Sequence, residues 1–199
     1  DNSFKKFISS KKIWCASSTH KTEEEFCGFV HKELNKKYKN LLTIIIPRHI
    51  ERTDEIEDNL VSMGLKIHKH EPKKKINDDT DIYIVNAYGK TKSFYSICKN
   101  VFLGGSLISH GGQNPLEAAR YGCNILHGPN THNFTEIYNF LKKKNISQKI
   151  NNEKQIIYYL NKYFSKKPNS RKIQKKLNSI GQKILENTLK EVKLILKNE

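Results

Sequence analysis

The chain has 199 residues, enough for one sizeable domain or two small ones, and its hydrophobic content of 36% can supply a core. The formal net charge of +16 comes almost entirely from lysine, because the 36 basic residues include few arginines. Those arginines are Arg48, Arg52, Arg120 and Arg171. Nucleic-acid binders commonly use arginine for forked contacts, so this composition favours an anionic ligand or an anionic membrane surface over nucleic acid. No apolar run approaches the roughly 20 residues of a membrane-spanning helix, and no signal peptide is visible.

The cysteines are spread along the chain, with no CxxC pair and no metal-type spacing with histidine. They are Cys15, Cys27, Cys98 and Cys123. This pattern predicts free thiols in a reducing compartment. The chain starts with Asp1 and not with methionine, so we expect it to be a piece of something longer.

Continuous apolar runs and helical periodicity alternate along the chain. The runs predict buried strands at residues 13–16, 42–46, 65–68, 82–85, 101–103 and 124–126. The periodicity predicts helices at about residues 22–34, 53–63, 92–98, 115–121, 133–142, 153–164 and 170–197. Residues 1–10 are a polar approach segment, and residues 69–79 are a charged surface loop.

Local signals mark two helix starts. Thr22 and Glu25 have the spacing of a capping box, and an acidic run suits a first helical turn, where the dipole favours negative charge. Asn114 is a good N-cap residue, and Pro115 then stands at the first helical position.

This alternation predicts an α/β fold, a Rossmann-like parallel sheet with helices on both faces. Ligands in such sheets bind beyond the carboxyl ends of the strands. The loops at those ends are residues 17–22, 47–52, 86–90, 104–113 and 127–132. Every chemically suggestive residue of the sequence lies in or beside one of them, which favours a binding site there.

The glycine-rich stretch of residues 104–117 is the central candidate. Its glycines permit close approach to a ligand, and its free backbone N–H groups, with the following helix terminus, suit an anion. Glu117 could accept hydrogen bonds from sugar hydroxyls, and Arg48, directly after a strand and Pro47, suits a phosphate or carboxylate. The alternatives are a purely structural turn, a first-turn acid that offsets the helix dipole, and a surface ion pair from Arg48 to Glu51 or Asp54.

Histidines also gather in these loops, namely His20, His49, His110, His127 and His132. None has ligand spacing with an acidic partner, so we expect hydrogen-bonding or steric roles and no metal site. No serine triad, HExxH motif or Walker loop is present. The loops therefore predict a cradle for a nucleotide or sugar nucleotide without a resident nucleophile or metal.

Several stretches, in this order, resemble the motifs of one enzyme family. They are Trp14-Cys15-Ala16-Ser17-Ser18-Thr19-His20 with Glu23-Glu24-Glu25, Pro47-Arg48-His49 with Arg52, Phe102-Leu103-Gly104-Gly105-Ser106-Leu107, Gly111-Gly112-Gln113-Asn114-Pro115-Leu116-Glu117, and Gly128-Pro129 before Asn133-Phe134. The family is that of the 3-deoxy-D-manno-octulosonic acid (Kdo) transferases of lipopolysaccharide synthesis. The motifs cover about residues 13–140, and the chain resembles the C-terminal, donor-binding half of these GT-B enzymes.

The resemblance implies transfer of Kdo from CMP-Kdo to a lipid A precursor, with inversion and without a cofactor or metal. The implied CMP-binding residues are Pro47, Arg48, Tyr88, Gly89, Lys90, Asn114, Pro115, Leu116 and Glu117. Residues that would support the donor site are His20, His49, Gly105 and Ser106. The general base belongs to the family's N-terminal half, so no catalytic residue is expected in this chain.

The resemblance also implies an organisation and a location. Residues 1–12 would be an interdomain approach segment, residues 13–167 the CMP-sugar-binding domain, and residues 168–199 an amphipathic helix that packs back toward the absent N-terminal domain or lies on the membrane. The helix carries one apolar stripe of Ile173, Leu177, Ile180, Ile184, Leu189, Val192 and Leu196. The expected location is the cytoplasmic face of the bacterial inner membrane, peripheral or anchored through the absent half, with an anionic membrane surface and no nucleic acid as partner.

The chain departs from the family pattern at Asn86, Lys90, Gln113 and Ala118. Lys90 stands where the family has glutamate, which reverses the charge beside the expected nucleotide. Two alternatives stay open, a GT-B donor domain that uses a UDP-sugar and a lysine-rich nucleic-acid or interaction module.

Overall fold

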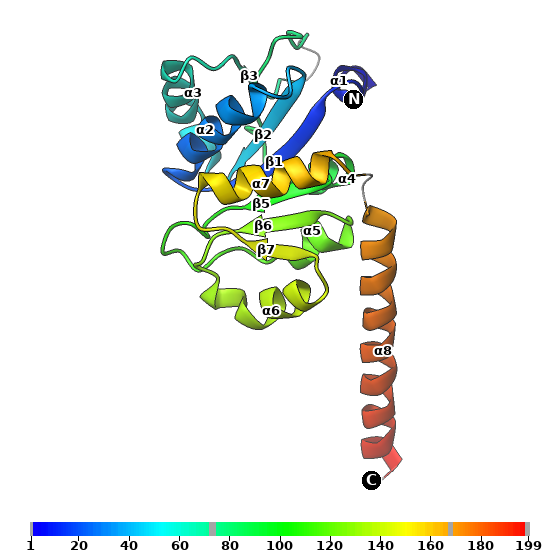
Figure 1. Ribbon diagram of the computed structural model, residues 1–199. Coiled ribbons are helices and arrows are strands. Elements are labelled where there is room, and N and C mark those ends of the chain that lie inside the picture. Colours follow the sequence, from blue (N-terminus) through cyan, green and yellow to red (C-terminus); the bar gives the residue numbers. More distant parts are fainter. Residues whose placement is uncertain (1, 72–74, 167–168, 198–199) are drawn as a thin grey trace.

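The computed structural model describes residues 2–71, 75–166 and 169–197. Within them the chain forms a parallel seven-stranded sheet of order β3-β4-β2-β1-β5-β6-β7 (Figure 1). The strands are β1 Lys12–Thr19, β2 Leu41–Pro47, β3 Ile67–Lys69, β4 Ile82–Ile84, β5 Asn100–Leu103, β6 Asn124–His127 and β7 Ser147–Lys149. The helices are α1 Asn2–Ile8, α2 Glu23–Asn35, α3 Thr53–Ser62, α4 Thr91–Ile97, α5 Leu116–Arg120, α6 Thr135–Lys143, α7 Glu153–Phe164 and α8 Ser170–Lys197, with short 3-10 helices η1 Ile50–Arg52 and η2 His132–Phe134.

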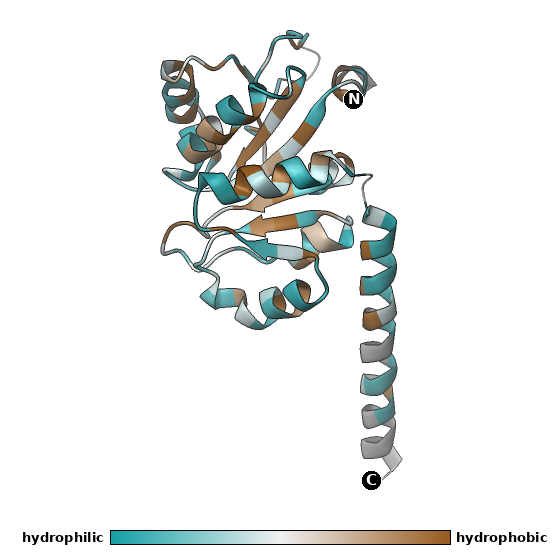
Figure 2. Cartoon of the chain, viewed as in Figure 1, coloured by the Kyte–Doolittle hydropathy of each residue, from teal (hydrophilic) through white to brown (hydrophobic). Residues whose placement is uncertain are grey.

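Both faces of the sheet are covered by helices, as predicted. Alternate residues of a strand point to opposite faces, so Cys15 packs on one side of β1 and Trp14 on the other. Residues of α1, α4, α5, α6 and the start of α8 share the core of Cys15, while α2, α3 and α7 share the core of Trp14. The strands are accordingly hydrophobic and the outer helix faces hydrophilic (Figure 2).

The strand order reverses between β1 and β5. Strands β2, β4 and β3 extend from one side of β1, whereas β5, β6 and β7 extend from the other. In open parallel sheets the crevice at such a reversal is the usual ligand site. The loop after Thr19 and the loop after Leu103 flank this point.

Two elements were missed by the sequence analysis. Strand β7 is short and polar, so no apolar run marks it in the sequence. It is defined by its pairing with β6. Residues 2–8, expected as a polar approach segment, form helix α1. The Phe4 ring lies 4.8 Å from Tyr83 and 5.8 Å from Phe94, measured between centroids. Helix α1 therefore packs on the domain core, and the predicted boundary between residues 12 and 13 falls inside β1.

The predicted capping box at the start of α2 is wrong. Thr22 has a left-handed backbone, with φ 78°, and its side chain makes no capping hydrogen bond. Instead, the backbone N–H of Glu23 donates to His20 O at 2.9 Å, and the Glu23 carboxylate accepts the N–H of His20 at 3.0 Å. The acidic run is turned inward, so that Glu23 and Glu24 are buried.

Among the described side chains of α8, those near its start pack on the domain, and the helix then extends away from the sheet (Figure 1). Ile173 is buried and Leu177 packs partly against the same core. Leu189, farther along the predicted stripe, is 49% exposed. The side chains of Ile184, Val192 and Leu196 and the predicted boundary at residues 167–168 lie outside what the structure describes. No helix in the described ranges combines the length and apolarity needed to span a bilayer.

Candidate functional site

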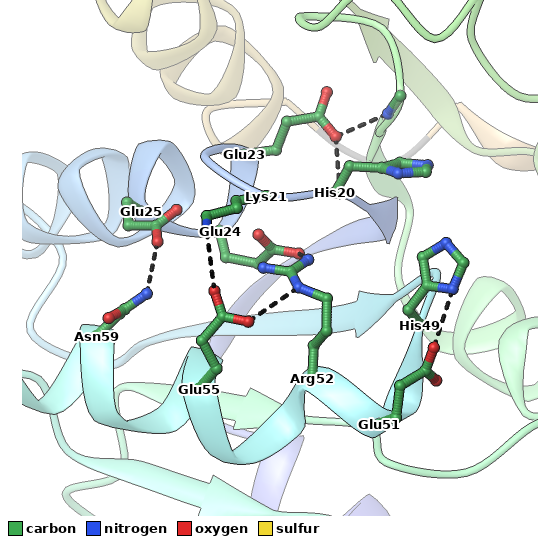
Figure 3. Close-up of polar contacts among 11 residues, drawn as sticks. His20, Lys21, Glu23, Glu24, Glu25, His49, Glu51, Arg52, Glu55 and Asn59 are labelled. Atoms are coloured by element: carbon green, nitrogen blue, oxygen red, sulfur yellow. Dashed lines mark hydrogen bonds and ion pairs between the residues drawn. The ribbon is translucent and has the colours of Figure 1, made fainter.

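The buried carboxylate of Glu23 lies at the centre of the sheet's carboxyl edge. It accepts the backbone N–H groups of Gly105 at 2.7 Å, Ser106 at 3.1 Å and Leu107 at 3.0 Å, besides that of His20. Figure 3 shows the Glu23 side chain at the start of α2, with its contacts to His20 and to one further backbone nitrogen. Charge-assisted hydrogen bonds of this kind are strong, and here they join the loop after β1 to the loop after β5.

This arrangement corrects the expectation for the glycine loop. The backbone N–H groups of residues 105–107 were predicted to be free for an anion, but Glu23 already uses them. Ser106 Oγ donates to Leu103 O and accepts the N–H of Gly128 at 2.8 Å, so this hydroxyl is also committed within the protein. The N–H of Gly105 and the N–H and hydroxyl of Ser106 are therefore already hydrogen-bonded within the protein.

Three imidazoles converge beside this carboxylate. The ring of His20, after β1, lies 4.2 Å from that of His110 and 5.7 Å from that of His49, between centroids. His20 is 8% exposed, whereas His49 and His110 are exposed. Burial, and then the nearby His110, His49, Arg48 and Arg52, lower the pKa of His20 to about 4. The sequence placed His20 and His49 in the site, and the structure adds His110.

Arg48 has no ionic partner among the residues that the structure describes. Its backbone N–H donates to Thr19 O at 2.9 Å, which fixes the end of β2 against the end of β1, and its side chain is exposed. The carboxylates considered as partners are engaged elsewhere, Glu51 with His49 at 3.2 Å and Asp54 with Lys69 at 2.9 Å. Among the described residues, no carboxylate pairs with Arg48, so its guanidinium can meet an anionic ligand.

Arg52 has a different, structural role. It pairs with Glu24 at 3.3 Å and with Glu55 at 3.2 Å (Figure 3). Burial raises the pKa of Glu24, and the neighbouring Arg52 opposes this shift. Because Glu24 is 1% exposed, Arg52 neutralises a buried carboxylate at the base of the loop that carries Arg48.

The turn of residues 88–90 follows β4, next to β2 in the sheet. Tyr88 is 66% exposed, and Gly89 has a left-handed backbone with φ 73°. Lys90 lines a cavity of about 460 Å³ together with residues of α1 and α4, including Phe4 and Phe94. The side chain of Tyr88 contacts Glu51, so this turn lies beside the loop that carries Arg48.

The start of α5 differs from the prediction by one residue, because the helix begins at Leu116 with Pro115, and not Asn114, in the N-cap position. The Asn114 side chain accepts the N–H of Leu116 at 3.0 Å, and the N–H of Ala119 donates to Pro115 O at 3.0 Å. Helix α5 spans only Leu116–Arg120, so its dipole is smaller than that of a long helix. Glu117 is half-exposed and lies 3.6 Å from Lys92.

Metal and thiol chemistry find no support in the described residues. No three or more His, Cys, Asp or Glu side chains among them are grouped to hold a metal ion. All four cysteines are buried and unpaired, as predicted. Burial raises the pKa of Cys15 and Cys27, and it raises that of Cys123 to about 12, so these thiols are unreactive core residues.

Comparisons with known proteins agree with this picture. No protein-family model matches the chain. It is 36% identical over 129 residues to a 3-deoxy-D-manno-octulosonic acid transferase of Haemophilus influenzae, across 65% of this chain and 30% of that protein. It is 31% identical over 152 residues to such a transferase of Aquifex aeolicus, across 76% of this chain and 42% of that protein. The chain thus spans less than half the length of these curated relatives.

A solved structure shares the fold. The C-terminal CMP-Kdo binding domain of WaaA from Acinetobacter baumannii superposes with a TM-score of 0.80 and 22% identity, across 88% of this chain and 92% of that one. The fold is therefore the Rossmann-like C-terminal domain of a GT-B glycosyltransferase. The chain belongs to the 3-deoxy-D-manno-octulosonic acid transferase family.

Proposed function

We propose that the chain is the donor-binding half of an inverting glycosyltransferase that moves Kdo from CMP-Kdo to a lipid A precursor. The guanidinium of Arg48, which has no ionic partner within the described parts of the chain, carries this proposal. Arg48 stands at the carboxyl edge, one strand from the reversal of strand order, and its neighbouring carboxylates are occupied. The leaving group of a CMP-sugar is a phosphate, and a metal-free site must offset its charge with such cations and N–H donors.

The other predicted contacts fit a nucleotide with two adjustments. Asn114 uses its side-chain oxygen to accept the N–H of Leu116, which leaves its amide N–H₂ for a ligand. Glu117 is paired with the exposed Lys92, so ribose hydroxyls would compete with a weak surface ion pair. Pro47, Pro115 and Leu116 would contribute backbone and van der Waals contacts, and Tyr88, Gly89 and Lys90 would close over the nucleotide from the turn after β4.

The whole reaction needs more than this chain. The catalytic base and the acceptor site would lie in an N-terminal domain, and the free length of α8 would pack back toward it. The net charge of +16 would hold the enzyme at the anionic cytoplasmic face of the inner membrane, since each basic residue near such a surface contributes about 1 kcal/mol. The chain alone would bind donor nucleotide without transferring sugar.

Calorimetric titration of the chain with CMP, UMP and UDP tests the proposal. We expect CMP to bind more tightly than the other two, and Arg48→Ala to weaken CMP binding by about 10- to 100-fold, as for a charge-assisted contact. Arg171→Ala, which removes the same charge from exposed α8, should leave CMP binding unchanged. Preference for UDP would support another GT-B donor domain. Salt-dependent RNA binding without nucleotide selectivity would support an interaction module, and either result would contradict the proposal.

A further inference from the structure

The three imidazoles at the carboxyl edge form a layered arrangement. His20 lies at the base, 8% exposed, with His110 at 4.2 Å and His49 at 5.7 Å between ring centroids. Each comes from a different loop, after β1, β5 and β2 respectively. The backbone N–H of His20 donates to the Glu23 carboxylate at 3.0 Å, which holds the loop after β1 in place.

One atom of this arrangement is unsatisfied. His20 Nε2 is buried and has no hydrogen-bond partner among the described residues. A buried polar atom left without a partner costs free energy, and native structures seldom retain one without a reason. The adjacent rings of His49 and His110 are exposed, so rotation of either side chain would admit a ligand atom as the missing partner.

The surroundings of His20 are positive. Arg48 has no ionic partner among the described residues, whereas Arg52 is neutralised by Glu24 and Glu55. Of the nearby carboxylates, Glu23 is bound to backbone N–H groups and Glu51 pairs with His49 on the outer side. No described carboxylate contacts the His20 or His110 ring, so both rings face a site that lacks a counter-charge.

We infer that His20 and His110, with His49 at the rim, form an anion-binding subsite that takes up a proton from solvent when it is occupied. The occupant is an oxyanion, either the phosphate of the nucleotide or the carboxylate of the sugar acid. The identity of this ligand rests on the proposed function. No covalent bond changes: one imidazole gains a proton, and the imidazolium N–H then donates to the bound oxyanion.

The free protein disfavours the charged imidazole, and the ligand reverses that preference. Burial and the surrounding cations hold the pKa of His20 near 4, so the ring is neutral at physiological pH. An oxyanion within hydrogen-bonding distance favours the charged ring and raises this pKa. Between the free and bound pKa values, affinity should therefore fall by up to tenfold for each unit of rising pH.

Proton uptake is measured by calorimetry in two buffers with different ionisation enthalpies. The ligands are cytidine, CMP and free 3-deoxy-D-manno-octulosonic acid, so that phosphate and carboxylate are tested separately. His110→Asn and His20→Asn should each reduce proton uptake, whereas His132→Asn, an exposed histidine at the same edge, should not. The CMP phosphate can also take up a proton on binding. Its contribution is common to wild type and variants, so the difference in proton uptake between them reports on the histidines.

Imidazole NMR of the unmutated chain covers the case in which His20→Asn fails to fold. We expect the His20 resonances to show a raised pKa with CMP or with the sugar acid, and not with cytidine. CMP binding with equal proton uptake in wild type and His110→Asn, and unchanged imidazole resonances, would overturn the inference and leave the donor-site proposal standing. Absence of CMP binding would overturn the proposed function, and the responses to the sugar acid and to inorganic phosphate would then decide the inference.

Discussion

The Glu23 carboxylate accepts the backbone N–H of Gly105 at 2.7 Å, from a residue 82 positions away in the sequence. It thereby fills, with the protein's own charge, the anion hole that a glycine-rich loop after a strand would offer a phosphate. The positive groups that remain for a ligand are Arg48 and the histidines around His20. The candidate site is thus displaced from the glycine loop toward the ends of β1 and β2.

Glu23→Gln should destabilise the domain by about 2–4 kcal/mol, because an amide cannot accept from all four backbone donors and leaves buried N–H groups unpaired. The free energy of unfolding, measured with urea, checks this. Glu33→Gln removes an acidic side chain that pairs with the exposed Lys36 and should change stability by less than about 0.5 kcal/mol. Equal effects of the two substitutions would show that the Glu23 hydrogen bonds contribute little.

Substitution of the two arginines in the loop after β2 should affect different properties, ligand binding for Arg48 and stability for Arg52. Arg48→Ala should leave the unfolding free energy within about 0.5 kcal/mol of wild type, since Arg48 has no ionic partner among the described residues. Arg52→Ala should lower it by about 2–4 kcal/mol, because the buried Glu24 loses its counter-charge. Urea unfolding of both variants measures the contrast. A stability loss in Arg48→Ala as large as that in Arg52→Ala would contradict an unpaired Arg48.

Acid should destabilise the domain partly through His127. This ring is 5% exposed, donates Nδ1–H to Gly128 O at 2.8 Å, and packs against Tyr138. Burial lowers its pKa to about 4, so its contribution is intact above pH 6.5 and falls as pH drops from 6.5 toward 4. The loss amounts to about 3 kcal/mol at 1.36 kcal/mol per pKa unit.

Urea unfolding at pH 7 and pH 5 tests this dependence. His127→Phe keeps an aromatic ring against Tyr138 and removes the titrating group. The variant should lose less stability between the two pH values than the wild type does. An identical loss in both proteins would show that His127 does not titrate with folding.

Gly128, directly after β6, lets its loop pass close to the backbone of the loop after β5 at Ser106. A Cβ at Gly128 would overlap the backbone O of Ser106, so Gly128→Ala should cost about 3 kcal/mol and disturb the loop held by Glu23. Gly181→Ala is the matched control, because a Cβ there meets open space within helix α8. Thermal unfolding should show a lower midpoint for the first variant only. An unchanged midpoint for Gly128→Ala would mean that the two loops are not in contact.

The sequence predicted those strands and helices that a local pattern of residues determines. Six of the strands and the helices from α2 onward follow from apolar runs and periodicity, whereas the capping predictions at Thr22 and Asn114 do not match the helix starts. Helix α1 was missed because its apolar residues are stabilised by a distant strand. Phe4, for example, packs on Tyr83 of β4, and no local pattern in the sequence indicates that contact. Strand β7 was missed because pairing with β6, and not composition, defines it.

The sequence predicted where the candidate site lies better than it predicted which side chains contact one another there. The positions of Arg48 and of the histidines follow from strand ends. The inward turn of Glu23 does not, because the left-handed Thr22 and the N–H groups of residues 105–107 create it together. The proximity of His110 to His20 likewise depends on the path of a loop that no local signal encodes.

The central claim is that CMP binds at the carboxyl edge beside Arg48, and a crystal structure of the chain with CMP tests it most directly. We predict the CMP phosphate within hydrogen-bonding distance of the Arg48 guanidinium, with the ribose toward Glu117. CMP bound instead in the cavity between α1 and α4 that Lys90 lines, with Arg48 uninvolved, would contradict the account.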